Sequence, residues 1–371
     1  EFDEPTDLAA SFLEMLSRPN LASFAFISQQ YDHEVQGGSV IKPLQGRGRV
    51  NGDASVTRPL LESAKGVVAA QALYPSYSDL DPYSMAACAI DTAVRNAVVA
   101  GAPLDQLALL DNFCWCSSNE PSRLGQLKEA AKACYDYAVA YGTPFISGKD
   151  SMFNDFKGFD AQGRPVKVSV PPTLLISATG VMSDSFKAVS LDAKLPGDLV
   201  YVLGETFDEL GGSEYYAMMG EKLSGKKLSG GKVPRVDAAR NKALYESYSK
   251  CVQQGIVASA QSVHRGGLAA ALAKTALGGM LGVDVSLNGL PGKVSRNDYA
   301  LYSETQGRIL ATIAPRDREA FEALLDGKAF KLVGRVTEGD SLLVTGLNNE
   351  VVVDVKLSTL SESYNSTFGG W

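Results

Sequence analysis

Residues 81–100 read DPYSMAACAIDTAVRNAVVA, and this stretch decides which class of fold the sequence predicts. Asp81 followed by Pro82 is typical of a helix start, because aspartate can cap the first turn and proline is tolerated at the first helical position. Gly101 marks the expected end. The apolar side of the predicted helix consists mostly of small residues, namely Met85, Ala86, Ala89, Ile90, Ala93, Ala97 and Val98. Small side chains allow close approach, so we expect this helix to pack tightly against a β-sheet.

The segments around this helix predict an α+β unit. Strands are predicted over residues 67–72 and 174–182, and a second helix begins at Ser122 and closes at Gly142, with Pro144 after it. A shorter helix is predicted over residues 8–18. Residues 36–53 are rich in glycine and basic residues, so we expect a mobile loop there.

The composition shifts at residues 183–197, which are polar and contain a Pro-Gly turn, and we place a domain boundary near residue 185. Beyond it, predicted strands (199–203, 308–314, 342–345, 350–355) alternate with predicted helices (236–254, 267–277, 315–325), which indicates an α/β domain. Residues 211–232 are rich in Gly, Lys and Ser and are expected to form a long mobile loop. We therefore predict a helical linker segment (1–42), an α+β domain (43–185) and an α/β domain (186–371).

Bulk composition restricts the possible functions. Of the 371 residues, 45% are hydrophobic and 21% are charged, which is typical of a globular protein. The formal net charge of −7 argues against binding of nucleic acid, which needs a basic face. No apolar run is long enough to predict a membrane span, and the acidic N-terminus does not resemble a signal peptide. Five scattered cysteines suit a reducing compartment, so we expect a cytoplasmic protein.

The most informative motif is Gly148-Lys149-Asp150-Ser151, which follows a predicted strand. Glycine lets a ligand approach the backbone, lysine can balance phosphate charge, and aspartate can hold Mg²⁺. Taken alone, an ordinary surface turn is the better interpretation. The motif is not a P-loop, because the first glycine of that pattern has no counterpart.

Three further motifs have two interpretations each. Asn96 follows Arg95 on the predicted helix, and the simple interpretation is that Asp91 and Arg95 form a solvated i,i+4 pair while Asn96 is a surface polar residue. The pair Gly266-Gly267 precedes a predicted helix and could seat an anion on free backbone N–H groups, or could form a tight turn. Ser303, Glu304 and Arg308 precede a strand and could clamp a phosphate, or could form a hairpin with an exposed salt bridge.

In their order along the chain, these motifs resemble the second half of the phosphoribosylformylglycinamidine synthase family. The resemblance covers nearly the whole chain, and Gly148 to Met152 is its most specific part. The matching stretches are Gln30-Tyr31-Asp32-His33, Gly52-Asp53-Ala54-Ser55-Val56, Leu80-Asp81-Pro82-Tyr83, Arg95-Asn96, Gly101-Ala102-Pro103, Asp111-Asn112-Phe113, Ser147-Gly148-Lys149-Asp150-Ser151-Met152, Gly266-Gly267-Leu268-Ala269 and Ser303-Glu304-Thr305.

The resemblance implies a two-domain fold like that of aminoimidazole ribonucleotide synthetase, in which the N-terminal α+β domain pairs with a second copy to form a barrel. The family reaction uses ATP to activate the amide oxygen of formylglycinamide ribonucleotide, and ammonia from a glutaminase then replaces that oxygen. ATP and Mg²⁺ are thus the implied cofactors of the whole enzyme. The implied nucleotide and phosphate residues are Lys149, Asp150, Ser151, Asn96, Gly266 and Gly267, and the implied substrate-side residues are Ser303, Glu304 and Arg308.

The chain departs from the family at three positions. Where the family usually has acidic residues near Mg²⁺ and nucleotide, this chain has Ala72, Thr92 and Ser262. Mg²⁺ prefers anionic oxygen ligands, so we expect a degenerate site that binds no nucleotide tightly. No residue of this chain is assigned as a ligand of the metal. The resemblance places the catalytic histidine in the other half and the glutaminase cysteine elsewhere, so no catalytic residue is expected here.

Three hypotheses follow. The chain could be a non-catalytic half of a synthase, with the N-terminal half and a glutaminase as partners, and could form a homodimer when excised. It could be an autonomous ATP-binding homodimeric enzyme of the same fold. It could also be a scaffold protein that keeps only the fold. Retained acidic ligands would favour the second hypothesis, and their loss favours the first.

Overall fold

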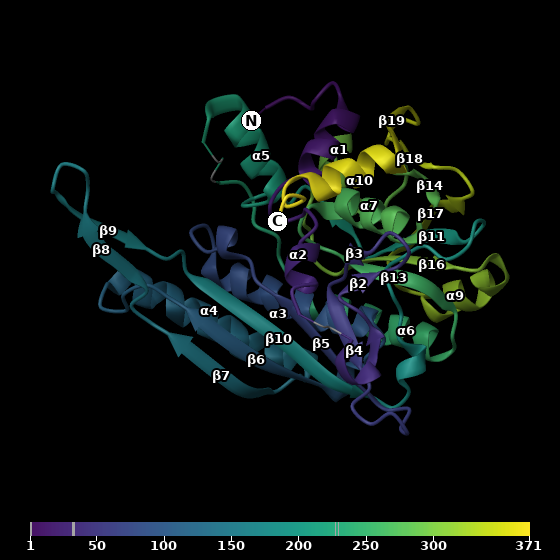
Figure 1. Ribbon diagram of the computed structural model, residues 1–371, viewed down its shortest axis with the longest axis horizontal. Helices are drawn as coiled ribbons and strands as arrows, with labels where there is room; N and C mark the ends of the chain where they lie inside the picture. The colour runs from purple at the N-terminus through teal and green to yellow at the C-terminus, as the bar shows by residue number, and fades with distance from the viewer. Residues whose placement is uncertain (1, 32–33, 227, 229) are drawn as a thin grey trace.

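The computed structural model of the chain describes residues 2–31, 34–226, 228 and 230–371. Asp32 and His33, which belong to the first matched motif, lie outside these residues. Two β-sheets with packed helices form two adjoining domains (Figure 1). This is the predicted pairing of an α+β domain with an α/β domain. The described helices include none long and apolar enough to cross a membrane. The five cysteines are free thiols.

The first sheet has six strands in the order β1-β4-β5-β10-β6-β7. Neighbouring strands are antiparallel except for β6 and β7, which are parallel. The predicted strands at 67–72 and 174–182 are confirmed as β5 and β10. The bounds are β1 Ser39–Ile41, β4 Ala54–Thr57, β5 Gly66–Ala72, β6 Leu107–Cys114, β7 Phe145–Ser151 and β10 Thr173–Met182.

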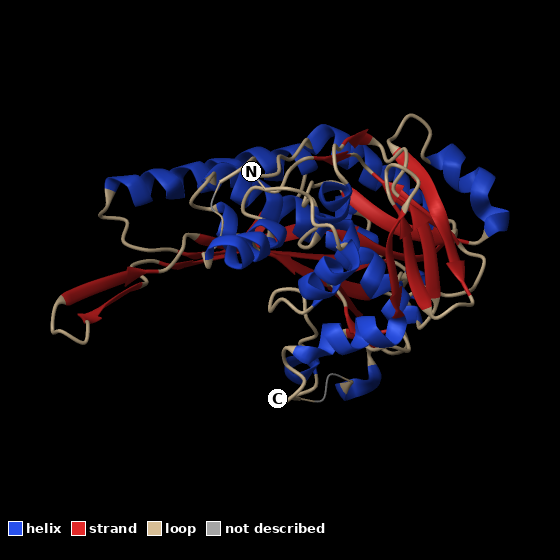
Figure 2. Ribbon diagram, turned by 90° about the horizontal axis from the view of Figure 1, so that it is seen from above, coloured by secondary structure: helices blue, strands red, loops and turns tan. Residues whose placement is uncertain are grey.

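Helices α3 (Pro82–Val99) and α4 (Pro121–Tyr141) lie on the same side of the first sheet (Figure 2). Burial alternates along β10, where Leu174, Ile176 and Ala178 are buried and the residues between them are half-buried. The opposite face of this sheet therefore has no helix over it within the described chain.

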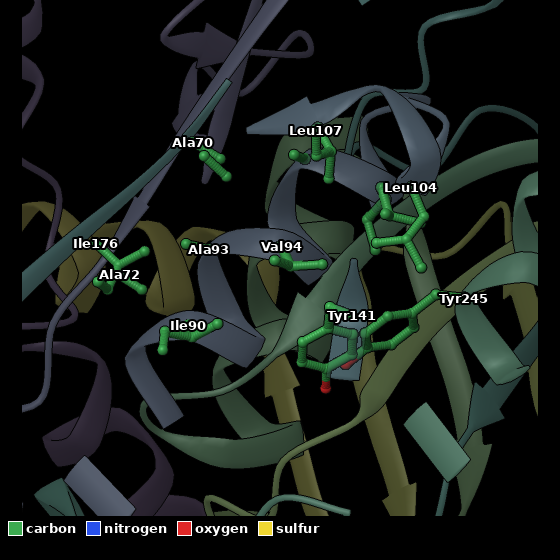
Figure 3. Close-up of a cluster of buried hydrophobic side chains, with 14 of the residues drawn as sticks. Ala70, Ala72, Ile90, Ala93, Val94, Leu104, Leu107, Tyr141, Ile176 and Tyr245 are labelled. Carbon is green, nitrogen blue, oxygen red and sulfur yellow. The ribbon is translucent and has the colours of Figure 1, made fainter. Parts of the chain in front are cut away.

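Both helices begin and end as predicted. The Asp81 side chain accepts a hydrogen bond from the Ser84 amide (2.9 Å) at the start of α3, and Gly142 closes α4 in the left-handed conformation (φ 75°). In Figure 3, Ile90 and Ala93 of α3 lie near Ala72 and Ile176 of the sheet, with Tyr141 and Tyr245 beyond them. Helix α3 is thus buried on nearly all sides.

The second sheet has seven strands in the order β13-β16-β11-β17-β14-β18-β19. The predicted strands at 199–203, 308–314, 342–345 and 350–355 are confirmed within a residue or two, whereas β13, β14 and β17 were not predicted. The bounds are β11 Leu199–Leu203, β13 Val257–Val263, β14 Gly282–Ser286, β16 Arg308–Ile313, β17 Phe330–Thr337, β18 Ser341–Thr345 and β19 Val351–Lys356.

Helices cover both faces of the second sheet. Helices α6 (Ala238–Gln253) and α9 (Arg318–Leu324) lie toward the first domain and share one apolar core with α3 and α4. The other face is covered by a second core that includes α1, α5, α7, α8 and α10. Their bounds are α1 Leu8–Leu16, α5 Glu214–Ser224, α7 Gly267–Gly279, α8 Asn297–Tyr302 and α10 Leu357–Ser366. Helix α1 packs on α10 and β19, so it belongs spatially to the C-terminal domain.

Three expectations about loops were wrong. Gly148 to Ser151 form part of strand β7 rather than a turn, because they pair with β6 in parallel. Residues 211–232 contain helix α5, which Ser213 caps by accepting a hydrogen bond from the Tyr216 amide (3.2 Å). Residues 36–53 form short ordered pieces, β1, β2 (Leu44–Gln45) and β3 (Val50–Asn51), after the short helix α2 (Ala25–Ser28).

The small residues of α3 predict a specific response to enlargement. Ala93 is fully buried, so Ala93→Leu should lower the free energy of unfolding by about 1–3 kcal/mol because the added carbons have no free space. The measurement is the melting temperature followed by circular dichroism. The control is Ala131→Leu on the exposed side of α4, which should change it little. Equal melting temperatures for the two variants would contradict close packing at α3.

Candidate functional site

A cavity of about 140 Å³ lies where the end of β5 meets α3 and the loop before α7. Its lining includes Asn96 and two of the three substituted positions, Ala72 and Thr92. The third, Ser262, lines an adjoining smaller cavity that shares Asp53 and Asn96 with the first. The structure thus gathers positions that are far apart in the sequence into one region between the two domains.

The hydroxyl groups at the substituted positions are bound within the protein. Thr92 donates a hydrogen bond to the Gln306 side-chain oxygen (2.7 Å), and Tyr74 lies 2.9 Å from the same hydroxyl. Ser262 accepts a hydrogen bond from the Arg95 Nε (2.9 Å). These groups carry no charge, so they do not replace the anionic oxygens that a magnesium nucleotide needs.

Arg95 provides a buried cation beside these hydroxyls. Its guanidinium pairs with Asp91 and also donates to Tyr245 and Gln306. Although burial favours the neutral form, Tyr245 and Asp91 outweigh it and raise the pKa of Arg95. The expectation of a solvated pair between Asp91 and Arg95 is therefore wrong, because both side chains are fully buried.

Asp53 is the acidic residue among those that line the cavity. Its carboxylate lies 3.1 Å from the His264 Nε2 and 3.4 Å from the Lys274 Nζ. Burial alone would raise the pKa of Asp53, but the Lys274 ammonium and the hydrogen-bonded His264 imidazole lower it well below its usual range. Burial in turn lowers the pKa of His264. Asp53 is thus already held by side chains of the protein.

Asn96 leaves one polar atom free toward this region. Its amide nitrogen donates to the Gln71 carbonyl (3.4 Å), while its buried Oδ1 has no hydrogen-bond partner in the protein. Arg265 lies at the same cavity, donates to the Leu73 carbonyl (2.7 Å) and stacks over the Tyr74 ring. The described residues contain no group of three or more His, Cys, Asp or Glu side chains arranged to hold a metal ion.

The glycine pair at α7 meets a carboxylate of the same chain. Gly266 and Gly267 have φ values of 77° and 66°, and the Gly266 amide donates to the Glu304 carboxylate (3.0 Å). That carboxylate also accepts from the Glu214 amide at the start of α5 (3.1 Å) and from the Tyr77 hydroxyl. Burial raises the pKa of Glu304. The backbone N–H of Gly266, which was predicted to bind an external anion, thus binds the Glu304 carboxylate of the same chain.

Ser303 and Arg308 lie in a buried turn beside Glu304. Ser303 donates to the Phe207 carbonyl (2.6 Å), and the Arg308 Nε donates to the Thr305 carbonyl (3.0 Å). Burial lowers the pKa of Arg308 to about 9. An exposed salt bridge at Arg308, the simple interpretation of this motif, is therefore wrong. Both side chains support the turn that carries Glu304.

Lys149, Asp150 and Ser151 lie apart from this region, on the edge strand β7. Lys149 pairs in register with Asn112 of β6, and its ammonium donates to the Ser151 hydroxyl. Lys149 and Asp150 are exposed. The sequence did not predict this separation, nor the roles of Lys274 and His264. The Gly-Asp pair at residues 52–53 was the one signal that pointed toward Asp53.

Comparison with known proteins agrees with this architecture. Residues 51–182 match the N-terminal domain model of AIR synthase related proteins, and residues 196–346 match the C-terminal domain model of the same family. The phosphoribosylformylglycinamidine synthase subunit PurL of Methanocaldococcus jannaschii is 34% identical over 98% of this chain and 47% of the relative. The chain thus spans about half the length of the curated relatives it matches.

Solved structures give the same fold. The structure of T. maritima PurL complexed with FGAR aligns with a TM-score of 0.72 and 21% identity, over 96% of this chain and 54% of that chain. The structure of T. maritima PurL complexed with ADP aligns with a TM-score of 0.68 and 20% identity, over 96% and 52%. Both domain models match this chain in order, and 98% of this chain aligns with PurL. The chain therefore belongs to the AIR synthase related proteins.

Proposed function

We propose that this chain forms the C-terminal half of a phosphoribosylformylglycinamidine synthase, which makes an amidine with ATP in purine biosynthesis in the cytoplasm. The observation that carries the proposal is similarity to PurL relatives over 96–98% of the chain but only 46–47% of their length. The other half would supply the catalytic histidine, and a glutaminase would supply ammonia.

Within this enzyme, the half described by the structure would be non-catalytic. Its cavity between the domains has Ala72, Thr92 and Ser262 where the family usually has acids, and Asp53 is engaged by His264 and Lys274. A magnesium nucleotide would have to displace these pairs and would gain no anionic ligand in exchange. This argues against the alternative of an autonomous ATP-dependent enzyme.

Direct titration tests the degenerate site. We expect this chain to give no heat of binding when titrated calorimetrically with ADP or ATP in the presence of Mg²⁺. T. maritima PurL, of which a structure complexed with ADP exists, is the positive control. Magnesium-dependent binding with a micromolar dissociation constant would favour the autonomous enzyme instead.

Lys149 and Asp150 suit a role at the active site of the other half. They lie exposed on the outer strand of the first sheet, and neither side chain forms an ion pair with another residue of the described chain. In a paired assembly, a lysine at this edge could neutralise a phosphate bound by the neighbouring unit, and the aspartate, whose side chain points to the opposite side of the strand, could share a metal. Ser151, hydrogen-bonded to Lys149, would fix its position.

A lysine variant tests this role in the full-length synthase. Lys149→Ala should lower kcat/KM by at least roughly tenfold, about 1.4 kcal/mol of transition-state stabilisation. The melting temperature should stay unchanged because the side chain is exposed. The matched control is Lys65→Ala, which removes another exposed lysine and should leave turnover unchanged. Unchanged kinetics for Lys149→Ala would make the motif an ordinary strand segment.

The open face of the first sheet suits pairing with the other half. Side chains on this face include Val67, Leu110, Leu175 and Val181, which are half-buried or exposed although apolar. Two such faces pressed together would form the barrel that the family resemblance implies. In the absence of the other half, two copies of this chain can supply both faces.

Self-association therefore provides another prediction. At high concentration this chain should form a dimer in light scattering, and Leu110→Lys combined with Leu175→Lys should shift it to a monomer because charge opposes burial of the face. Val351→Lys on the second sheet, at another exposed apolar residue, is the control and should stay dimeric. A wild-type chain that remains monomeric would count against pairing through this face.

A further inference from the structure

Strands β8 (Asp155–Phe159) and β9 (Pro165–Ser169) form a separate two-stranded arm. The arm projects beyond the first sheet, away from the C-terminal domain (Figure 2). Its register pairs Phe156 with Val168 and Gly158 with Val166. A lone two-stranded ribbon has no core of its own and is only marginally stable in water.

One face of the arm is entirely apolar. Because side chains alternate along a strand, Phe156, Val166 and Val168 point to the same side around Gly158. Phe156 and Val168 are 63% and 58% exposed. The Phe156 ring lies over Gly158, where a Cβ atom would come within 2.6 Å of the ring. The opposite face is mixed, since it carries Lys157 and Lys167 in register and Phe159 opposite Pro165.

The base of the arm is firmly attached, so its direction is fixed. The Asp155 carboxylate accepts a hydrogen bond from the Ser117 amide (3.1 Å) and lies 3.7 Å from the Lys167 ammonium, which also pairs with Glu120. The Asn154 amide donates to the Trp115 carbonyl (3.0 Å). An arm that is anchored at its base but apolar and exposed beyond it is preorganised to bind a surface.

The arm continues directly from the edge of the first sheet. Three residues, 152–154, join β7 to β8, and Phe153 among them adopts a positive φ of 60°, which is rare for an aromatic residue. Strand β7, on which Lys149 would face a paired unit, is therefore followed directly by the arm. A unit that pairs at this edge would meet the apolar face next.

We infer that the apolar face of the arm docks on the other half of the full-length synthase and clasps the unit that pairs with the first sheet. This inference rests on the proposed function, and the matching relatives are about twice as long as this chain, which leaves enough protein to supply that surface. A second copy of this chain, or a separate subunit, is a different occupant that the experiment distinguishes.

Hydrogen–deuterium exchange followed by mass spectrometry tests the arm. Amides of residues 155–169 should exchange roughly tenfold more slowly in the full-length synthase, without other subunits, than in this chain alone at a concentration where it is monomeric. If β7 becomes protected but the arm does not, the docking inference fails while the proposed pairing stands. If neither becomes protected, both fail. Protection of the arm only on adding a glutaminase or on dimerisation of this chain would assign it a different occupant and overturn the inference.

Variants on the two faces of the arm make the test specific. In the full-length synthase, Phe156→Ser with Val168→Ser should restore fast exchange to the arm. Phe159→Ser is the control, because it removes an even more exposed aromatic ring (74%) from the opposite face, and it should leave the protection in place. Equal loss of protection in both variants would show that the arm merely unfolds.

Discussion

The buried carboxylate of Asp91 is the interaction on which the two-domain arrangement depends. It lies on α3 in the first domain and receives hydrogen bonds from Tyr141 of α4, from Tyr245 (2.8 Å) and Asn241 (2.9 Å) of α6, and from Arg95. Removing one partner from such a buried pair leaves an uncompensated charge, which costs about 3–5 kcal/mol. The alanines of α3 let α4 and α6 come close enough for this network, so packing and polar contacts depend on each other.

In the cavity between the domains, most polar groups form hydrogen bonds or ion pairs with other side chains of the same chain. Arg95 reaches the hydroxyls of Thr92 and Ser262, His264 and Lys274 hold Asp53, and Glu304 joins the starts of α5 and α7. Each of these contacts uses a group that could otherwise have met an external ligand. The Asn96 Oδ1 is a buried exception, with no partner in the protein.

Sequence patterns predicted those parts of the fold whose signals are local. The cap at Asp81, the closing Gly142 and the alternating apolar strands located α3, α4, β5 and β10 because each depends on neighbouring residues. The second half of β7, Gly148 to Ser151, was mistaken for a turn because its pairing residues in β6 lie 37 positions earlier in the chain. The substituted positions could be located by motif, but the engagement of Glu304 with Tyr77, Glu214 and Gly266 could not. Those residues are far apart in sequence and meet only through tertiary packing.

The parallel pairing of β6 with β7 also bears on the order of folding. In the first sheet the other pairs are antiparallel, whereas β7 reaches its place only after the chain has crossed back through the whole of α4. Closing that connection costs more chain entropy than forming a hairpin, but less than bringing β10 to β6 and β5, whose paired residues are farther apart in the sequence, so β7 should join β6 before β10 completes the sheet. During synthesis, the edge strand β7 is made after α4. The unpaired backbone groups of this edge are therefore absent until α4 can cover the sheet, which limits premature aggregation between nascent chains.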